Sequence, residues 1–194
     1  MVVVLADGVI GQMMEKVVLP PFRPRWTEEE IRQMHPWATL GRTPERKPNV
    51  ITSLALQAEE MEEINLRLQG RYQEIMKNEV RYEEVMCEDA EYLIVGFGIS
   101  ARIGQKAAEM AREEGLKVGL LRPITLFPFP TNEIKRLADQ VKGMLTVELS
   151  AGQMVDDVRL AVNGKVPVEF YGRMGGIVPS PDEVLNALKE KVIK

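Results

Sequence analysis

The chain has 194 residues, a hydrophobic content of 45% and a formal net charge of −4 at pH 7. Its length suits one sizeable domain, or a domain with an appendage. Because basic residues are interspersed with acidic ones, the composition argues against a nucleic-acid-binding surface and a polybasic membrane patch. No apolar run approaches the ~20 residues of a membrane span, and we expect no signal peptide at the N-terminus.

The chain has one cysteine, Cys87, and one histidine, His35. These counts exclude an internal disulfide, a cysteine-ligated zinc or iron–sulfur site built from this chain alone, and a Ser-His-Asp triad. We therefore predict no catalytic set and no metal site. Such cysteine usage suits a reducing, cytoplasmic setting.

The N-terminal segment is apolar from its second residue. Residues 2–6 (VVVLA) predict a fully buried parallel strand, and residues 7–12 predict a turn into a short helix. A buried strand here needs a sheet to join. We expect either that it docks on a partner or that the chain is the C-terminal part of something longer.

Residues 17–52 are rich in Pro, Arg and Trp, which predicts an extended connector with one short helix capped by Thr27. Residues 53–87 predict one long helix, or two helices broken near Gly70, because apolar residues recur at spacings of three, four or seven. These residues are Met61, Ile64, Leu68, Tyr72, Ile75, Tyr82 and Met86. Two interpretations stay open: an amphipathic helix packed on its own domain, and a bridging or oligomerising arm.

From Glu91 onward, predicted strands alternate with predicted helices. The strands are 92–95, 117–121, 144–149 and 166–171, and the helices between them are 100–114, 131–140 and 152–162. A final helix begins with a capping box in which Ser180 is the N-cap, Pro181 is N1 and Glu183 is N3. This alternation predicts an α/β fold with a parallel sheet of about four to five strands and flanking helices.

Glycine-punctuated loops follow three of these strands. In a parallel sheet such loops gather at one edge, where α/β proteins bind ligands or partners. The residues that we expect to form an interface or ligand-binding edge are Gly96, Gly98, Ser100, Arg122, Ser150, Gly152, Gln153, Arg173, Gly175 and Gly176.

Each group of edge residues allows two interpretations. Gly96-x-Gly98-x-x-Ala101 matches the dinucleotide fingerprint, and Arg122 stands where an acidic residue is expected, which would suit the 2′-phosphate of NADP. The alternative is a tight turn that needs small residues. Ser150 would make a polar contact across an interface or cap the following helix. Arg173 would bind a carboxylate or phosphate, or form a salt bridge between subunits.

Several motifs resemble the alpha subunit of 2-oxoacid:ferredoxin oxidoreductases, most closely the 2-ketoisovalerate type. They are residues 5–14 (LADGVIGQMM), 46–51 (RKPNVI), 100–103 (SARI), 121–130 (LRPITLFPFP), 148–154 (ELSAGQM) and 170–176 (FYGRMGG). The motifs span nearly the whole chain in order and resemble the C-terminal half of that subunit.

The resemblance implies an enzyme that oxidatively decarboxylates a 2-oxoacid on thiamine diphosphate, yields an acyl-CoA and reduces ferredoxin through iron–sulfur clusters. The beta subunit would bind the diphosphate and Mg²⁺, and a small subunit would carry clusters. Ferredoxin and CoA would be partners of the complex, with no nucleic acid and no membrane. The assembly would be a hetero-oligomer, with a homodimer as the alternative for this chain alone.

The resemblance also divides the chain. Residues 1–16 would be a remnant of the pyrimidine-binding domain, 17–52 the connector, 53–90 a helical arm and 91–194 a transketolase C-terminal-like α/β domain. The essential Glu of the pyrimidine domain has no counterpart, so no catalytic residue carries over and no cofactor is expected on this chain alone. We expect a role in assembly rather than catalysis, with a stand-alone NADP-binding module as the alternative.

Overall fold

The computed structural model describes residues 2–22, 25–38, 41, 44 and 47–193. Arg46, the first residue of one motif quoted above, lies outside these ranges. The chain separates into two compact units, one of Met14–Gln69 and one of Met1–Met13 with Gly70–Lys194.

The Met14–Gln69 unit contains a short helix, α2 (Glu28–Met34), which begins as predicted. The Thr27 hydroxyl accepts a hydrogen bond from the backbone N–H of Glu30, and the Glu30 carboxylate accepts one from the backbone N–H of Thr27. These two bonds satisfy backbone donors that would otherwise lack partners at the helix start.

The predicted helix over residues 53–87 is only partly correct. Helix α3 (Ala58–Asn78) runs without a break through Gly70, and the chain then forms strand β1 (Tyr82–Val85). Strand β1 pairs antiparallel with β3 (Val118–Pro123), with Glu83 opposite Arg122. The helical spacing extends past residue 78 in the sequence, but pairing with a distant strand determines the structure there.

The sheet has five strands in the order β1-β3-β2-β4-β5. The remaining strands are β2 (Tyr92–Val95), β4 (Gly143–Glu148) and β5 (Val168–Gly172). Neighbours among β2, β3, β4 and β5 are parallel, and only the edge strand β1 is antiparallel. The predicted α/β fold with a parallel sheet of four to five strands is confirmed.

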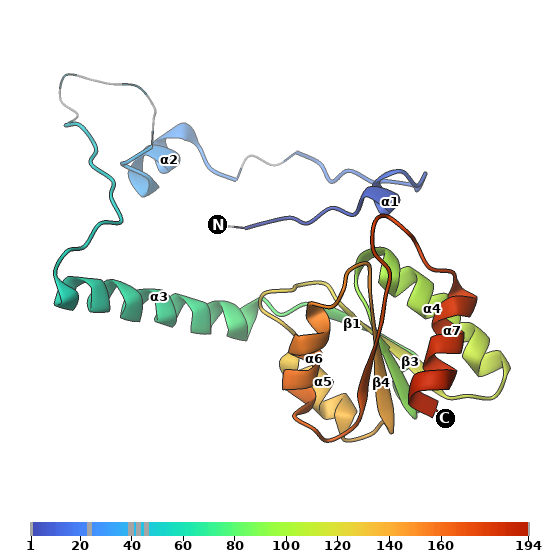
Figure 1. Cartoon of the computed structure of the whole chain (residues 1–194). Helices are drawn as coiled ribbons and strands as arrows, with labels where there is room; N and C mark the ends of the chain where they lie inside the picture. Colours follow the sequence, from blue (N-terminus) through green and yellow to red (C-terminus); the bar gives the residue numbers. More distant parts are fainter. Residues whose placement is uncertain (1, 23–24, 39–40, 42–43, 45–46, 194) are drawn as a thin grey trace. The chain divides into compact units, whose positions relative to one another are not determined.

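Four helices cover the sheet, α4 and α7 on one face and α5 and α6 on the other (Figure 1). They are α4 (Gly98–Glu113), α5 (Thr131–Ala138), α6 (Met154–Val162) and α7 (Pro181–Leu188), and a π-helix, η1 (Lys189–Ile193), follows α7. The capping box of α7 is confirmed. Helix α5 begins at Thr131 as predicted, with Pro130 as its N-cap residue, and α6 begins two residues later than predicted.

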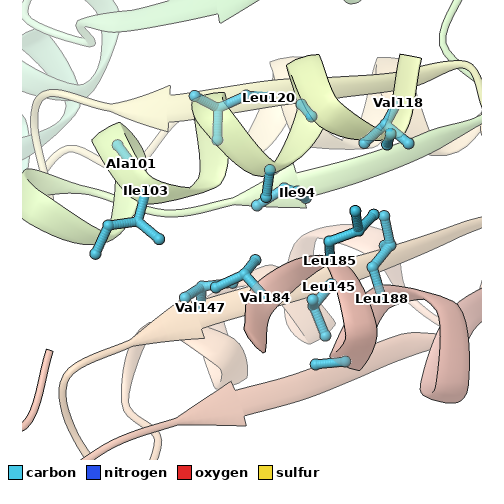
Figure 2. Close-up of a cluster of buried hydrophobic side chains, with 14 of the residues drawn as sticks. Ile94, Ala101, Ile103, Val118, Leu120, Leu145, Val147, Val184, Leu185 and Leu188 are labelled. Carbon is cyan, nitrogen blue, oxygen red and sulfur yellow. The ribbon is translucent and has the colours of Figure 1, made fainter. Parts of the chain in front are cut away.

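The core has two layers because successive strand side chains point to opposite faces. On the α4 and α7 face, Ile94, Leu120 and Leu145 meet side chains of both helices (Figure 2). On the other face, residues such as Leu93 and Met144 pack against α5 and α6. Strand β2 contributes fully buried side chains to both layers, as expected for a central parallel strand.

The N-terminal segment differs from its prediction. Residues 2–6 form no strand, and the side chains of Val2 to Leu5 are 70–89% exposed. The predicted short helix is present as α1 (Gly8–Gly11), and Ile10 packs against the core layer under α4 and α7. Among the described residues, no helix is long and apolar enough to span a membrane.

Candidate functional site

The carboxyl ends of β2, β3, β4 and β5 lie at one edge of the sheet because these strands are parallel. We call this the carboxyl edge. It brings together the predicted residues of the three glycine loops, which follow β2, β4 and β5. The chain leaves β2 toward β3 on one side and later returns to β4 on the other, so β2 and β4 flank a topological switch point. Ligands of open α/β sheets bind at such points.

A carboxylate of the chain itself occupies the β2 side of the switch point. Asp7 Oδ2 accepts a hydrogen bond from the backbone N–H of Ile99 at 3.3 Å, in the first turn of α4. The other oxygen, Oδ1, caps α1 by accepting from Val9 N at 2.8 Å and Ile10 N at 3.3 Å. Gly98 has φ +56°, and a Cβ there would lie 3.2 Å from Asp7 Oδ2. The glycine that the dinucleotide fingerprint would assign to a phosphate therefore accommodates Asp7.

A second carboxylate closes the β4 side. Glu148 ends β4 and is only 3% exposed. Its oxygens accept from the backbone N–H groups of Gln153 at 3.1 Å, Met154 at 3.0 Å and Val155 at 2.9 Å. These donors begin α6, where the helix dipole also favours negative charge. Glu148, rather than Ser150, therefore caps α6.

Ser150 supports this arrangement from the preceding loop. Its hydroxyl donates to Glu148 Oε2 at 3.2 Å and accepts from the backbone N–H of Gly152 at 3.1 Å. Gly172, at the end of β5, approaches the same loop so closely that a Cβ there would lie within 3.0 Å of the Ser150 carbonyl oxygen. Only glycine fits at that position without a shift of the loop.

The loop after β5 is tied to α7. Arg173 Nη1 lies 2.6 Å from Glu183 Oε1, with the two side chains 33% and 41% exposed. A hydrogen bond to Tyr171 and the charge of Glu183 raise the pKa of Arg173. The backbone N–H of Ser180, followed by the charge of Arg173, lowers the pKa of Glu183. Gly175 and Gly176 follow in the exposed part of this loop.

Arg122 does not join the switch point. It lies near the end of β3, and its Nη1 is 2.9 Å from Glu83 Oε2 on β1. Both side chains are about half exposed. This pairing directs the guanidinium toward the antiparallel strand instead of the Gly96–Gly98 turn, which weakens the NADP interpretation.

Ser100 and Cys87 are buried components of the domain. Ser100 is 3% exposed in α4, and Cys87 is 3% exposed beside β3. Cys87 Sγ donates to the Leu120 carbonyl oxygen at 3.2 Å, and burial raises the pKa of the thiol to about 11. A thiol with so high a pKa is a poor nucleophile near neutral pH. Within the described ranges, no group of three His, Cys, Asp or Glu residues could hold a metal ion.

Exposed apolar side chains lie in two of the loops that follow the strands at the carboxyl edge. Phe127 is 62% exposed in the loop after β3, and Met174 and Ile177 are 59% and 51% exposed in the loop after β5. Sequence reasoning identified the loops but missed Asp7 and Glu148 as the groups that close them. The signal for Asp7 was its place before a short helix, and the signal for Glu148 was a carboxylate at a strand end before a helix.

The structure is an open α/β domain in which two carboxylates of the chain, Asp7 and Glu148, accept hydrogen bonds from backbone N–H groups at the carboxyl edge. Residues 90–184 match the family model of pyruvate:ferredoxin oxidoreductase core domain II. The ketoisovalerate oxidoreductase subunit VorB of Methanothermobacter thermautotrophicus is 45% identical over 192 residues, which cover 97% of this chain and 52% of that relative. The 2-oxoglutarate synthase subunit KorA of Methanothermobacter marburgensis is 35% identical over 101 residues, or 52% of this chain and 27% of that relative.

Solved structures agree on the fold. A 2-oxoglutarate:ferredoxin oxidoreductase from Magnetococcus marinus, with 2-oxoglutarate, coenzyme A and succinyl-CoA bound, gives a TM-score of 0.58 at 19% identity over 76% of this chain and 25% of that chain. A split-gene transketolase, an inactive beta4 tetramer, gives 0.50 at 19% identity over 58% of this chain and 41% of its own. The chain belongs to the 2-oxoacid:ferredoxin oxidoreductase family. It spans about half the length of the VorB relatives that it matches.

Proposed function

We propose that the chain is part of the alpha subunit of a thiamine-diphosphate-dependent 2-oxoacid:ferredoxin oxidoreductase of the 2-ketoisovalerate type. The assembled enzyme would decarboxylate the 2-oxoacid oxidatively, form an acyl-CoA and reduce ferredoxin. Within it, this chain would serve assembly rather than catalysis, in a cytoplasmic setting that suits its single free thiol. The high identity to VorB over almost the whole chain supports the substrate class.

The donor set of this chain does not fit the cofactors of such an enzyme. One cysteine cannot ligate an iron–sulfur cluster. The helix N-termini that would attract a diphosphate at α4 and α6 already bind Asp7 and Glu148. We therefore assign thiamine diphosphate, Mg²⁺ and the clusters to other parts of the assembly, namely the beta and iron–sulfur subunits.

The assembly role is supported by two properties of the carboxyl edge, its internally capped helix starts and its exposed apolar side chains. Its helix starts are capped internally, so it offers few open donors to an anion, yet Phe127, Met174 and Ile177 expose apolar side chains in loops of the same edge. Protein–protein interfaces combine an apolar centre with a polar rim. We propose that this edge contacts the beta subunit or a neighbouring alpha chain. We also propose that residues 1–16 and 17–52 have the domain roles expected above, and that the helical arm ends with α3, because β1 belongs to the sheet of the α/β domain.

The test is co-purification of the chain with co-expressed beta and iron–sulfur subunits. Met174→Glu and Ile177→Glu should each reduce recovery of those subunits roughly tenfold, because a charge would enter the apolar centre of the interface. Leu160→Glu is the matched control, since Leu160 is 78% exposed near the far end of α6. Equal recovery with all three variants would overturn the assignment of this edge.

A further inference from the structure

Helix α3 presents an apolar stripe of exposed and partly exposed side chains that the proposed function does not use. None of its 21 residues is buried. The stripe is formed by Met61, Ile64, Leu68, Tyr72 and Ile75. Spacings of three and four place these side chains on one face of a helix. Tyr72 makes an edge-to-face contact with Phe127 and remains 42% exposed.

The stripe has the same spacing in both directions along the helix. Its steps are three, four, four and three residues, centred on Leu68. A two-fold contact between identical helices pairs residue i with residue j and j with i, so a stripe with this spacing can lie against its own copy in the antiparallel orientation. A partner of different sequence imposes no such symmetry on the stripe.

We propose that α3 pairs with α3 of a second copy of this chain, antiparallel, with the two-fold axis at Leu68. Met61 of each copy then lies opposite Ile75 of the other, Ile64 lies opposite Tyr72, and Leu68 lies opposite Leu68. The apolar contact extends over about 21 Å of helix, at a rise of about 1.5 Å per residue.

The charges of α3 favour the antiparallel orientation. The first six residues contain Glu59, Glu60, Glu62 and Glu63, whereas the remainder contains Arg67, Arg71 and Lys77 with Glu74 as its only carboxylate. An antiparallel pair sets the acidic part of each helix beside the basic part of the other. A parallel pair would set four carboxylates beside four carboxylates and would be disfavoured by their repulsion.

The test is sedimentation equilibrium of the purified 194-residue chain at micromolar concentration. We expect a species of twice the mass of one chain. Leu68→Glu and Leu68→Lys should each raise the dissociation constant of the dimer at least tenfold, because like charges then meet on the two-fold axis. Mixing the two variants should restore the dimer, since the glutamate of one copy then meets the lysine of the other.

Leu66→Glu is the matched control. Leu66 is 67% exposed and lies on the opposite face of α3, so its substitution should leave association unchanged. A monomeric parent chain, a dimer that survives Leu68→Glu, or a mixture that stays monomeric would each overturn the pairing. Far-UV circular dichroism checks that each variant stays folded, which we expect because α3 lies outside the core. The inference does not depend on the proposed function, since it is measured on the chain alone.

Discussion

The carboxylate of Asp7 accepts a hydrogen bond from the backbone N–H of Ile99, 92 residues further along the chain. The same carboxylate caps α1. One side chain thus joins the N-terminal segment to the first turn of α4 at the switch point of the sheet. The arrangement explains why Gly98 is needed at a place where no phosphate has to approach.

Asp7→Ala should destabilise this junction. The substitution removes an N-cap and the partner of the Ile99 N–H, and loss of a cap costs about 1 kcal/mol. We expect faster hydrogen exchange at the start of α4 and in α1, with a small decrease in the melting temperature. Asp7→Asn keeps an oxygen acceptor and should exchange more slowly than Asp7→Ala. Identical exchange in both variants and the parent would contradict the role of Asp7.

Glu148→Ala should lower the free energy of unfolding by about 3 kcal/mol, because it leaves backbone donors at the start of α6 buried without a partner. Urea denaturation measures the change. Asp157→Ala is the control, since Asp157 is an exposed carboxylate in the first turn of the same helix. It should cost less than about 1 kcal/mol. Similar losses for the two variants would mean that burial of Glu148 is unimportant.

Gly172→Ala should destabilise the domain by about 1–3 kcal/mol, because the added Cβ would collide with the Ser150 carbonyl and the Phe170 ring. Gly70→Ala provides the contrast. Gly70 lies inside α3 with open space around it, so alanine should stabilise the helix by about 0.5–1 kcal/mol. Thermal unfolding tests whether Gly172→Ala lowers the melting temperature and Gly70→Ala raises it. An unchanged melting temperature for Gly172→Ala would contradict the close approach of Gly172 to the Ser150 carbonyl.

The buried thiol of Cys87 should make stability depend on alkaline pH. Its pKa is raised from 9.0 to about 11 in the folded chain, so the folded state holds this proton more tightly than the unfolded state does. The contribution is complete below about pH 9 and is lost as the pH rises toward 11. Urea midpoints between pH 8 and pH 11 should fall less steeply for Cys87→Ala than for the parent. Parallel curves would exclude the thiol as the cause.

Local patterns in the sequence were enough to predict much of the α/β unit. Ser180, Pro181 and Glu183 predict the start of α7 because a capping box involves only neighbouring residues. Alternating strands and helices predict the parallel sheet for the same reason, since each element has its own periodicity. The glycine loops could likewise be placed at one edge, because the carboxyl ends of parallel strands lie at the same edge of the sheet.

The sequence-based predictions were wrong where contacts between residues far apart in the chain determine the structure. Tyr82 continues the helical spacing of α3, yet it lies in β1 because that segment pairs with β3. Residues 2–6 have the composition of a buried strand, but a strand needs a neighbour, and in this structure they are exposed. The bond between Asp7 and Ile99 could not be read from spacing, since nothing local connects the two residues.

We propose that the chain works within a 2-oxoacid:ferredoxin oxidoreductase assembly. The most direct measurement is affinity purification of the tagged chain from the cells that encode it, followed by an assay of viologen dye reduction that depends on 2-ketoisovalerate and CoA. We predict recovery with iron–sulfur-bearing subunits and dye reduction by the eluate that requires both substrates. Recovery of the chain alone, without dye reduction, would contradict the claim.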